Sequence, residues 1–363
     1  MSRLLARHRL KGEWALMEPW SCPTSTEGGS GVVMLAHGEG GRLSRRLVRD
    51  HVLDKFRDPR LASLPDAAVL PLLVGAPVMT TDSFVVSPLE FPGGDIGKLA
   101  VFGTANDLAV AGARPRWLTV ALVIEEGLPF ELLDRLLLSL SRAADEAGMA
   151  VIAGDTKVVP RGTADRLFIT TTGLGEQLSP VLAGPESLEA GDVLIATGPI
   201  GRHGMAVLAA RESLVVDPQP TSDCASLWPA VESLYGASIV PRAMRDATRG
   251  GVAAVLHEWA AACGRTLLWD ATSAPITSEV RGLSELLGID PLHSANEGTM
   301  LVAVAPSQVD AALAALRRTP VARAAAVVGR VEARGLSPVL VRRTLGRPQP
   351  LDDPAGAPLP RIC

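Results

Sequence analysis

Hydrophobic positions along the chain follow two patterns that alternate from residue 32 onward. Where apolar residues recur every three or four positions, the pattern predicts helices, and short continuous apolar runs predict strands. We expect helices at 42–56, 97–113, 129–148, 204–212, 251–263, 277–287 and 307–318. We expect strands at 76–81, 84–86, 117–124, 150–153, 167–173, 193–197, 267–269, 300–305 and 324–331. This alternation is typical of α/β proteins built from packed layers.

The alternation is interrupted once, at residues 175–191, which are rich in Gly and Pro, and then starts again. We therefore expect an extension at 1–31, an N-terminal domain at 32–178 and a C-terminal domain at 179–345. Residues 346–363 contain five prolines in 18 residues. A segment of this composition has little apolar surface to bury, so we expect a mobile, extended tail.

Composition narrows the class of protein. Hydrophobic residues make up 47% and charged residues 20% of the 363 positions, which is typical of a chain with a packed core. The net charge of −4 provides no basic field for nucleic acid. The longest uncharged stretch has 15 residues and two prolines, whereas a membrane span needs about 20 apolar residues. The N-terminus has no apolar signal core. We expect a cytoplasmic protein without a nucleic-acid or membrane partner.

A glycine-rich loop lies between the first apolar run and the first predicted helix. It reads His37-Gly38-Glu39-Gly40-Gly41. Three glycines in four residues allow backbone N–H groups to approach an anion near the start of a helix. The spacing matches neither the Walker A motif nor the dinucleotide fingerprint, and Glu39 adds negative charge. A phosphate loop and a plain turn both remain open.

Three acidic residues in the first half are candidate metal ligands. Asp82 and Asp155 directly follow predicted strands, and Asp107 lies beside Asn106 on a predicted helix. Oxygen ligands from separate elements are what Mg²⁺ bound to a nucleoside triphosphate requires, although acids also cap helices and turns. Thr156 and Lys157 follow Asp155, and Lys157 is one of only four lysines against 31 arginines. A loop lysine in such a chain indicates a need for its compact charge.

Two candidates lie in the second half. Asp246, Arg249 and Gly250 precede a predicted helix, where they form either a phosphate clamp or an ordinary helix start. Glu297 immediately precedes a predicted strand. A carboxylate at such a place is either a general base or a turn residue exposed to water.

The four cysteines show no Cys-x-x-Cys spacing, so neither a zinc knuckle nor a disulfide scaffold is expected. Cys22, Cys224 and Cys263 are interpreted as core or surface thiols. Cys363 is the last residue of the predicted tail. Eighteen extended residues reach roughly 55 Å, so a thiol at the tip is a candidate covalent carrier. The alternative is a chain end that happens to be cysteine.

Taken together, these segments resemble the HypE family of hydrogenase expression/formation proteins, within the PurM-like superfamily related to aminoimidazole ribonucleotide synthetase. The resemblance runs from about residue 32 to the end, and the Pro-Arg-Ile-Cys ending separates this family from its relatives. The matching segments are AHGEGG at 36–41, TDSFVV at 81–86, GDIGKLA at 94–100, GTANDLA at 103–109, GDTKV at 154–158, DATRGG at 246–251, NEG at 296–298 and PRIC at 360–363.

The resemblance implies a two-domain PurM-like α/β fold whose N-terminal sheets pair across a homodimer, with ATP held between the domains. It also implies that Cys363 receives a carbamoyl group from the carbamoyltransferase HypF. The thiocarbamate is then dehydrated to a thiocyanate at the expense of ATP, and the cyano group passes to iron on the HypC–HypD complex for [NiFe]-hydrogenase.

On this interpretation each candidate residue has a role. Asp82, Asp107 and Asp155 hold Mg²⁺, Lys157 stabilises developing charge, and Glu297 accepts a proton. The nucleotide site would draw on His37, Gly38, Gly40, Gly41, Asn106, Thr156, Asp246, Arg249 and Gly250 in addition. Two alternatives remain: an ATP-dependent small-molecule kinase or synthetase of the same superfamily, and a carrier of carbamoyl or cyano groups that does not use ATP.

Overall fold

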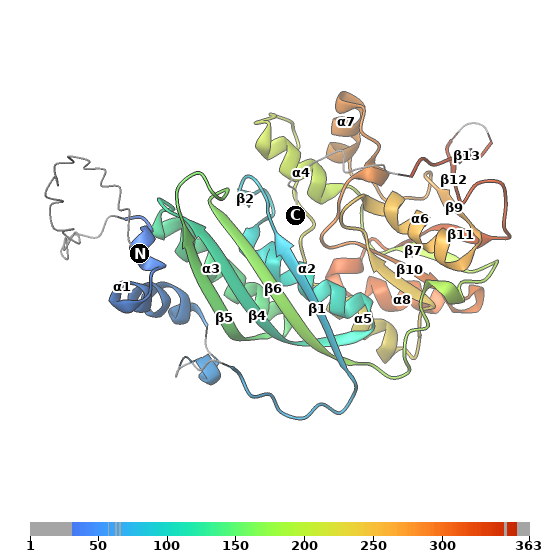
Figure 1. The fold of residues 1–363 in the computed structure, drawn as a ribbon. Coiled ribbons are helices and arrows are strands. Elements are labelled where there is room, and N and C mark those ends of the chain that lie inside the picture. Colours follow the sequence, from blue (N-terminus) through green and yellow to red (C-terminus); the bar gives the residue numbers. More distant parts are fainter. Residues whose placement is uncertain (1–30, 57, 62–63, 65–66, 345–346, 354–363) are drawn as a thin grey trace, which may run out of the picture.

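The computed structural model describes residues 31–353 except 57, 62–63, 65–66 and 345–346, and two β-sheets organise it (Figure 1). The first sheet has the strand order β1-β6-β4-β5. Its strands are β1 (Pro77–Phe84), β4 (Ala113–Glu125), β5 (Ala150–Val159) and β6 (Leu167–Gln177). Helix α3 (Phe130–Ala147) connects β4 to β5, the one parallel pair, and the other pairs are antiparallel.

Helices cover only one face of this sheet. Along β4, Leu118, Val120, Leu122 and Ile124 are buried, while the residues between them are half-buried. This alternation places every second side chain against α2 (Ile96–Val110) and α3, both of which lie on the same side of the sheet (Figure 1). The opposite face carries no helix of the described chain.

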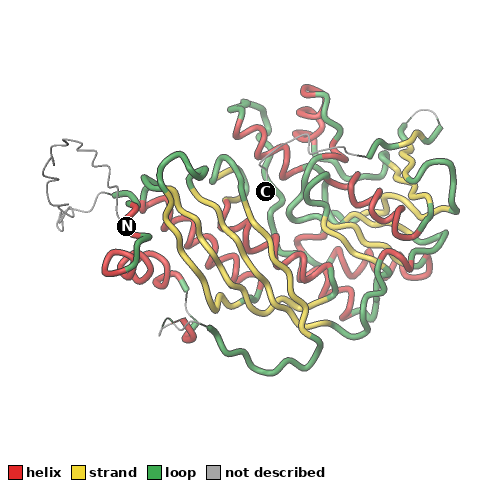
Figure 2. Tube along the Cα trace, viewed as in Figure 1, coloured by secondary structure: helices red, strands yellow, loops and turns green. Residues whose placement is uncertain are grey.

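The second sheet has seven strands in the order β13-β12-β9-β11-β7-β10-β8. Its strands are shorter than those of the first sheet (Figure 2). The strands are β7 (Val193–Ala196), β8 (Ala243–Asp246), β9 (Thr266–Asp270), β10 (Met300–Val304), β11 (Ala326–Glu332), β12 (Val339–Arg342) and β13 (Gln349–Pro350). The helices that follow the first domain are α4 (Arg202–Arg211), α5 (Trp228–Gly236), α6 (Gly251–Cys263), α7 (Ser278–Leu287) and α8 (Val309–Arg317).

Both faces of the second sheet are covered, because its strands are apolar on both sides. In β10, Leu301 and Ala303 pack with α6, whereas Met300, Val302 and Val304 pack with α5 and α8. A fully buried strand of this kind appears in the sequence as a continuous apolar run. The predicted mixed α/β class is confirmed.

Two differences from the predicted elements affect the site. The break expected at Asp82-Ser83 is absent, since β1 pairs with β6 without interruption from Pro77 to Phe84. Strand β5 continues to Val159, so Asp155 and Lys157 lie within a strand and not in a loop after it. Both strands lie at sheet edges, where polar side chains at exposed positions do not interrupt pairing.

Other differences are smaller. The helical segment predicted at 42–56 begins as α1 (Gly41–Arg46) and continues through a π-helical turn, Leu47–Val52, and a 3₁₀ turn, Leu53–Lys55. The sequence patterns did not indicate α5, β8, β12 or β13, which are short. The helices of the described ranges are all too short or too polar to cross a bilayer.

The first part of the segment predicted to be a tail is attached to the second sheet, as far as Leu351. Gln349–Pro350 pairs with β12, and the backbone N–H of Leu351 donates to the Val339 carbonyl at 3.1 Å. Nε2 of His257 on α6 lies 3.1 Å from the Leu351 carbonyl oxygen, and the Leu351 side chain packs in the α6 core. Cys363 lies outside the described residues, twelve positions beyond this anchor.

We expect Leu351→Ala to release the anchored end without unfolding the domain. Replacing a buried leucine by alanine costs about 2–5 kcal/mol, here against local opening of the attachment. Amide hydrogen exchange at Gln349 and Leu351, the two residues of this segment with an N–H group, should therefore accelerate by roughly tenfold or more, while α6 keeps its protection. Asp352→Ala, which changes an exposed neighbour, is the matched control. Unchanged exchange at Gln349 and Leu351 would contradict the anchor.

Candidate functional site

Four carboxylates from both halves of the chain approach one another where α2 passes between the sheets. Asp82 comes from β1, Asp107 from α2, Asp246 from the end of β8, and Glu297 from the loop before β10. The pairing of Met300 with Asp246 places the Glu297 loop at the same end of the second sheet as Asp246. Each of Asp82, Asp107 and Asp246 raises the pKa of Glu297 through its charge.

Burial dominates the electrostatics of this cluster. Asp246 is only 5% exposed, and burial followed by the charge of Asp107 raises its pKa to about 7. Burial also raises the pKa of Asp107, against the hydrogen bond that Thr80 Oγ1 donates to its Oδ2 at 3.0 Å. Glu297 is 3% exposed, and burial followed by the charge of Asp246 raises its pKa well above the ordinary value. The cluster therefore favours a proton or a bound cation.

Glu297 also has an unpaired atom. Its Oε1 is buried and has no hydrogen-bond partner among the residues that the structure describes. A buried acceptor without a partner costs about 1–3 kcal/mol, so the arrangement favours a ligand that supplies a donor or a positive charge. Arg249 Nη2 lies 3.9 Å from Asp82 Oδ1 in the turn before α6, where Gly250 adopts a positive φ of 78°. The arginine thus brings an exposed cation to the edge of the acidic cluster.

Asp155 does not join this cluster within one chain. Asp82 is paired across β6 and β4 with Gly154 on β5, so three strand spacings, about 14 Å, separate the two acids. Asp155 Oδ2 forms a 3.0 Å ion pair with Lys157 Nζ, and the hydrogen bond from Lys157 lowers its pKa. The register of β5 on β4 places both side chains on the sheet face without helices.

The predicted glycine loop lies beside β5 and not beside Asp82. A Cβ added to Gly38 would approach Val158 Cβ to 2.8 Å, so only glycine allows the loop to lie this close to the strand. Gly40 and Gly41 have positive φ values of 83° and 76°. His37 is buried, its Nδ1 accepts the Met34 N–H at 2.9 Å, and burial lowers its pKa. His37 therefore shapes the loop from within.

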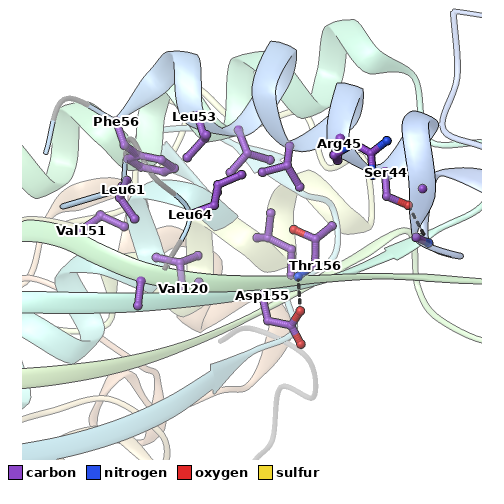
Figure 3. A pocket seen from close by; sticks show the side chains of 17 residues that line it. Ser44, Arg45, Leu53, Phe56, Leu61, Leu64, Val120, Val151, Asp155 and Thr156 are labelled. Atoms are coloured by element: carbon purple, nitrogen blue, oxygen red, sulfur yellow. Dashed lines mark hydrogen bonds between the residues drawn. The ribbon is translucent and has the colours of Figure 1, made fainter. Parts of the chain in front are cut away.

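Behind this loop is a cavity of about 320 Å³ between the helical segment 41–64 and strands β4 and β5 (Figure 3). Its far end is apolar, with Leu53, Phe56, Leu61, Leu64 and Val151 on its walls. Gly40, Gly41, Ser44 and Arg45 line the end nearest the loop. The side chain of Asp155 points away from the cavity in Figure 3. An apolar chamber with a polar mouth suits a flat aromatic base that carries an anionic group.

The structure gives Asn106 a different role from the predicted nucleotide contact. Its side chain is 1% exposed and is used within the protein. Its Nδ2 donates to the carbonyls of Ala225 and Glu297 at 3.0 and 3.2 Å, and its Oδ1 accepts the Leu227 N–H at 2.7 Å. Buried peptide groups need such partners, and the asparagine supplies them from α2.

The predicted metal set is thus divided between two places. Asp82 and Asp107 lie together, whereas Asp155, Thr156 and Lys157 lie with the glycine loop at the far edge of the sheet. Within the described residues, no three His, Cys, Asp or Glu side chains are already arranged to hold a metal ion. Cys363 and Cys22 fall outside those residues, and Cys224 and Cys263 are free thiols.

We expect Asp246→Asn to change how stability depends on pH in the metal-free protein. A carboxyl whose folded pKa is raised destabilises the folded state as pH rises from the unfolded pKa, 3.8, through about 7. The asparagine side chain does not titrate and resembles the protonated carboxyl, so the variant's free energy of unfolding should match wild type near pH 4. It should exceed wild type by up to roughly 4 kcal/mol above pH 7. Urea titrations in EDTA measure this, and parallel pH curves would contradict it.

Comparisons with known proteins identify the family. The family model for the N-terminal domain of AIR synthase related proteins matches residues 65–177, and the model for their C-terminal domain matches residues 189–341. The carbamoyl dehydratase HypE of Escherichia coli K12 is 45% identical over 337 residues, 91% of this chain and 99% of that protein.

Two solved structures are similar over nearly their full length. A hydrogenase maturation protein HypE in complex with ATP has a TM-score of 0.87 at 41% identity, covering 91% of this chain and 99% of that one. A HypE–HypF complex has a TM-score of 0.75 at 40% identity, with coverages of 85% and 99%. This chain belongs to the HypE family of carbamoyl dehydratases, within the AIR synthase related proteins.

Proposed function

We propose that this chain is an ATP-dependent carbamoyl dehydratase that converts an S-carbamoyl group on Cys363 into a thiocyanate during [NiFe]-hydrogenase maturation. The observation that carries the proposal is the 45% identity to a carbamoyl dehydratase across 99% of that relative's length. The Pro-Arg-Ile-Cys ending and the buried acidic cluster provide the nucleophile and the base that such a reaction needs.

The chemistry explains why ATP is required. The oxygen of S–C(=O)–NH₂ is a poor leaving group, so water is not lost readily at neutral pH. Transfer of the γ-phosphoryl group to that oxygen makes inorganic phosphate the leaving group. Removal of both N–H protons and departure of phosphate then leave S–C≡N, with ADP as the other product. The site must also exclude water, which would hydrolyse the activated group.

Glu297 is the proposed proton acceptor. Its pKa is raised by burial, which strengthens it as a base, and its Oε1 is free to accept an N–H proton. Lys157 is proposed to stabilise charge on the phosphorylated oxygen, since it is exposed and its ion-pair partner Asp155 is itself a candidate metal ligand.

The cavity behind the glycine loop is the proposed place for the adenine base, with the phosphates near Gly40 and Gly41. A relative of this chain was crystallised with ATP, which supports nucleotide binding here. Asp82 and Asp107, with Asp155, are the proposed Mg²⁺ ligands, because a cation would relieve the repulsion among the buried carboxylates. Bound Mg²⁺ would neutralise charge on the transferring phosphoryl group.

A homodimer would reconcile these placements. The helix-free face of the first sheet and its two edge strands are suited to a second copy, and Met79 on β1 is 72% exposed. In such a dimer, Asp155 and Lys157 of one copy would complete the site that Asp82 and Asp107 begin in the other.

We propose HypF as the carbamoyl donor and the HypC–HypD complex as the cyanide acceptor. The similarity to a HypE crystallised with HypF supports the first partner. A reaction that consumes ATP and needs a free thiolate fits the reducing cytoplasm.

The proposed function is tested by the mass of the C-terminal peptide after incubation with carbamoyl phosphate, HypF and ATP. Wild type should progress from carbamoylated to cyanated Cys363. Glu297→Gln should stop at the carbamoylated thiol, because the amide cannot take up the proton. Cys363→Ala should bind ATP normally and carry neither group. Cyanation of another cysteine, or full cyanation in Glu297→Gln, would overturn the assignment.

Mixing two inactive variants tests the shared site. Asp82→Asn and Asp155→Asn should each lack dehydration as homodimers. If the copies exchange freely, half of the dimers are mixed and each has one intact site, so activity should return to about a quarter of wild type. Mixing Asp82→Asn with Asp107→Asn is the control, because both changes fall in the same half-site. Equal recovery in both mixtures, or in neither, would contradict a site shared between copies.

A further inference from the structure

Residues 221–227, here called the strap, lie between α2 and the loop that carries Glu297. The Ser222 N–H donates to the Pro92 carbonyl at 2.8 Å, and the Leu227 N–H donates to Asn106 at 2.7 Å. The strap is therefore attached to the first half of the chain on one side. On its other side, the Ala225 N–H donates to the Glu297 carbonyl at 3.3 Å.

Asp223 is the strap residue that reaches the Glu297 loop with its side chain. Its Oδ1 accepts the Glu297 N–H at 3.0 Å, and its Oδ2 accepts the Gly298 N–H at 3.2 Å. A Cβ on Gly298 would overlap the Asp223 carbonyl oxygen, so glycine is needed for this approach. The Glu297 carbonyl is held separately by Asn106. Both peptide groups of Glu297 are fixed, while its side-chain Oε1 has no partner in the described part of the chain.

The choice of an acid at this position is informative. Asparagine could accept one of the two N–H groups without repelling Glu297, whereas aspartate places a like charge beside a buried carboxylate. The charge of Asp223 contributes to the raised pKa of Glu297, together with the charges of Asp246 on β8, Asp82 on β1 and Asp107 on α2. Like charges are unfavourable in a purely structural contact but strengthen a base.

We propose that Asp223 is a positioning residue for Glu297: its carboxylate holds the Glu297–Gly298 backbone with both oxygens and keeps the glutamate side chain in one place with its acceptor free. The inference rests on the proposed role of Glu297 as proton acceptor. It adds a residue that neither contacts the nucleotide cavity nor belongs to the predicted site.

The test is Asp223→Asn, measured by the rate of thiocyanate formation on Cys363 by the full-length protein. The amide offers one acceptor where the carboxylate offers two, so the loop is held less firmly. We expect kcat for dehydration, here the single-turnover rate constant at saturating ATP, to fall by about 10-fold or more, with carbamoylation of Cys363 and KM for ATP changed less than about twofold. Removing the negative charge lowers the pKa of Glu297, so the acidic limb of the rate profile should move to lower pH.

Asp192→Asn is the matched control. Asp192 is also a buried carboxylate that accepts a backbone N–H, from Glu189 at 2.7 Å, and pairs with Arg242 at 3.0 Å. It directly precedes β7, and within the described residues its side chain bonds to Glu189 and Arg242 and not to the Glu297 loop. Its loss should lower the melting temperature while leaving kcat and the pH limb of dehydration unchanged.

The outcomes separate the two proposals. If folded Asp223→Asn has the wild-type kcat and the acidic limb of its rate–pH profile does not move, the positioning role is overturned while Glu297 remains the base. Dehydration in Glu297→Gln would instead overturn the base itself. If Asp223→Asn does not fold, Asp223→Glu retains the charge but displaces both oxygens by one methylene. In that variant kcat should fall and the limb should stay, and a wild-type kcat would overturn the inference.

Discussion

The contact between α2, the strap and the Glu297 loop depends on the hydrogen bonds of one buried amide, the side chain of Asn106. It comes from α2, which packs against the first sheet, and it pairs with three peptide groups of the strap and the Glu297 loop. Each of those groups would cost about 1–3 kcal/mol if left buried and unpaired. Asp107 is the residue after Asn106 on α2, so these bonds also fix the position of Glu297 relative to Asp107.

With α2 and the Glu297 loop held together in this way, the acidic cluster follows from where the strands end. Asp246 terminates β8, Glu297 precedes β10, and the antiparallel pairing of these strands brings both acids to one end of the sheet. Asp82 and Asp107 arrive from the other half on β1 and α2. Folding thus concentrates negative charge in a poorly hydrated place, which is stable only because protons or cations are available to neutralise it.

The sequence predicted the fold class, most long elements and the family, since these depend on hydrophobic period and on local motifs. It did not predict that Asp155 would lie about 14 Å from Asp82, because strand order is not visible in local patterns. The structural role of Asn106 could not be predicted, because its bonds are to residues more than a hundred positions away. The role of Asp223 could not be predicted, because a single acid in a polar segment does not indicate its partner. Leu351 was assigned to the tail because proline-rich composition concealed a buried side chain.

The anchor at Leu351 limits how far Cys363 can lie from the second sheet. Twelve residues span at most about 40 Å, and one thiol in a sphere of that radius corresponds to a mean concentration of about 6 mM. A tether of 18 residues would lower this value roughly threefold. A substrate that is always present at millimolar concentration needs little affinity of its own. Under the proposed function, a carrier thiol held within this distance would need only a weak, easily reversed contact at the dehydration site, and it could then leave to meet the next protein.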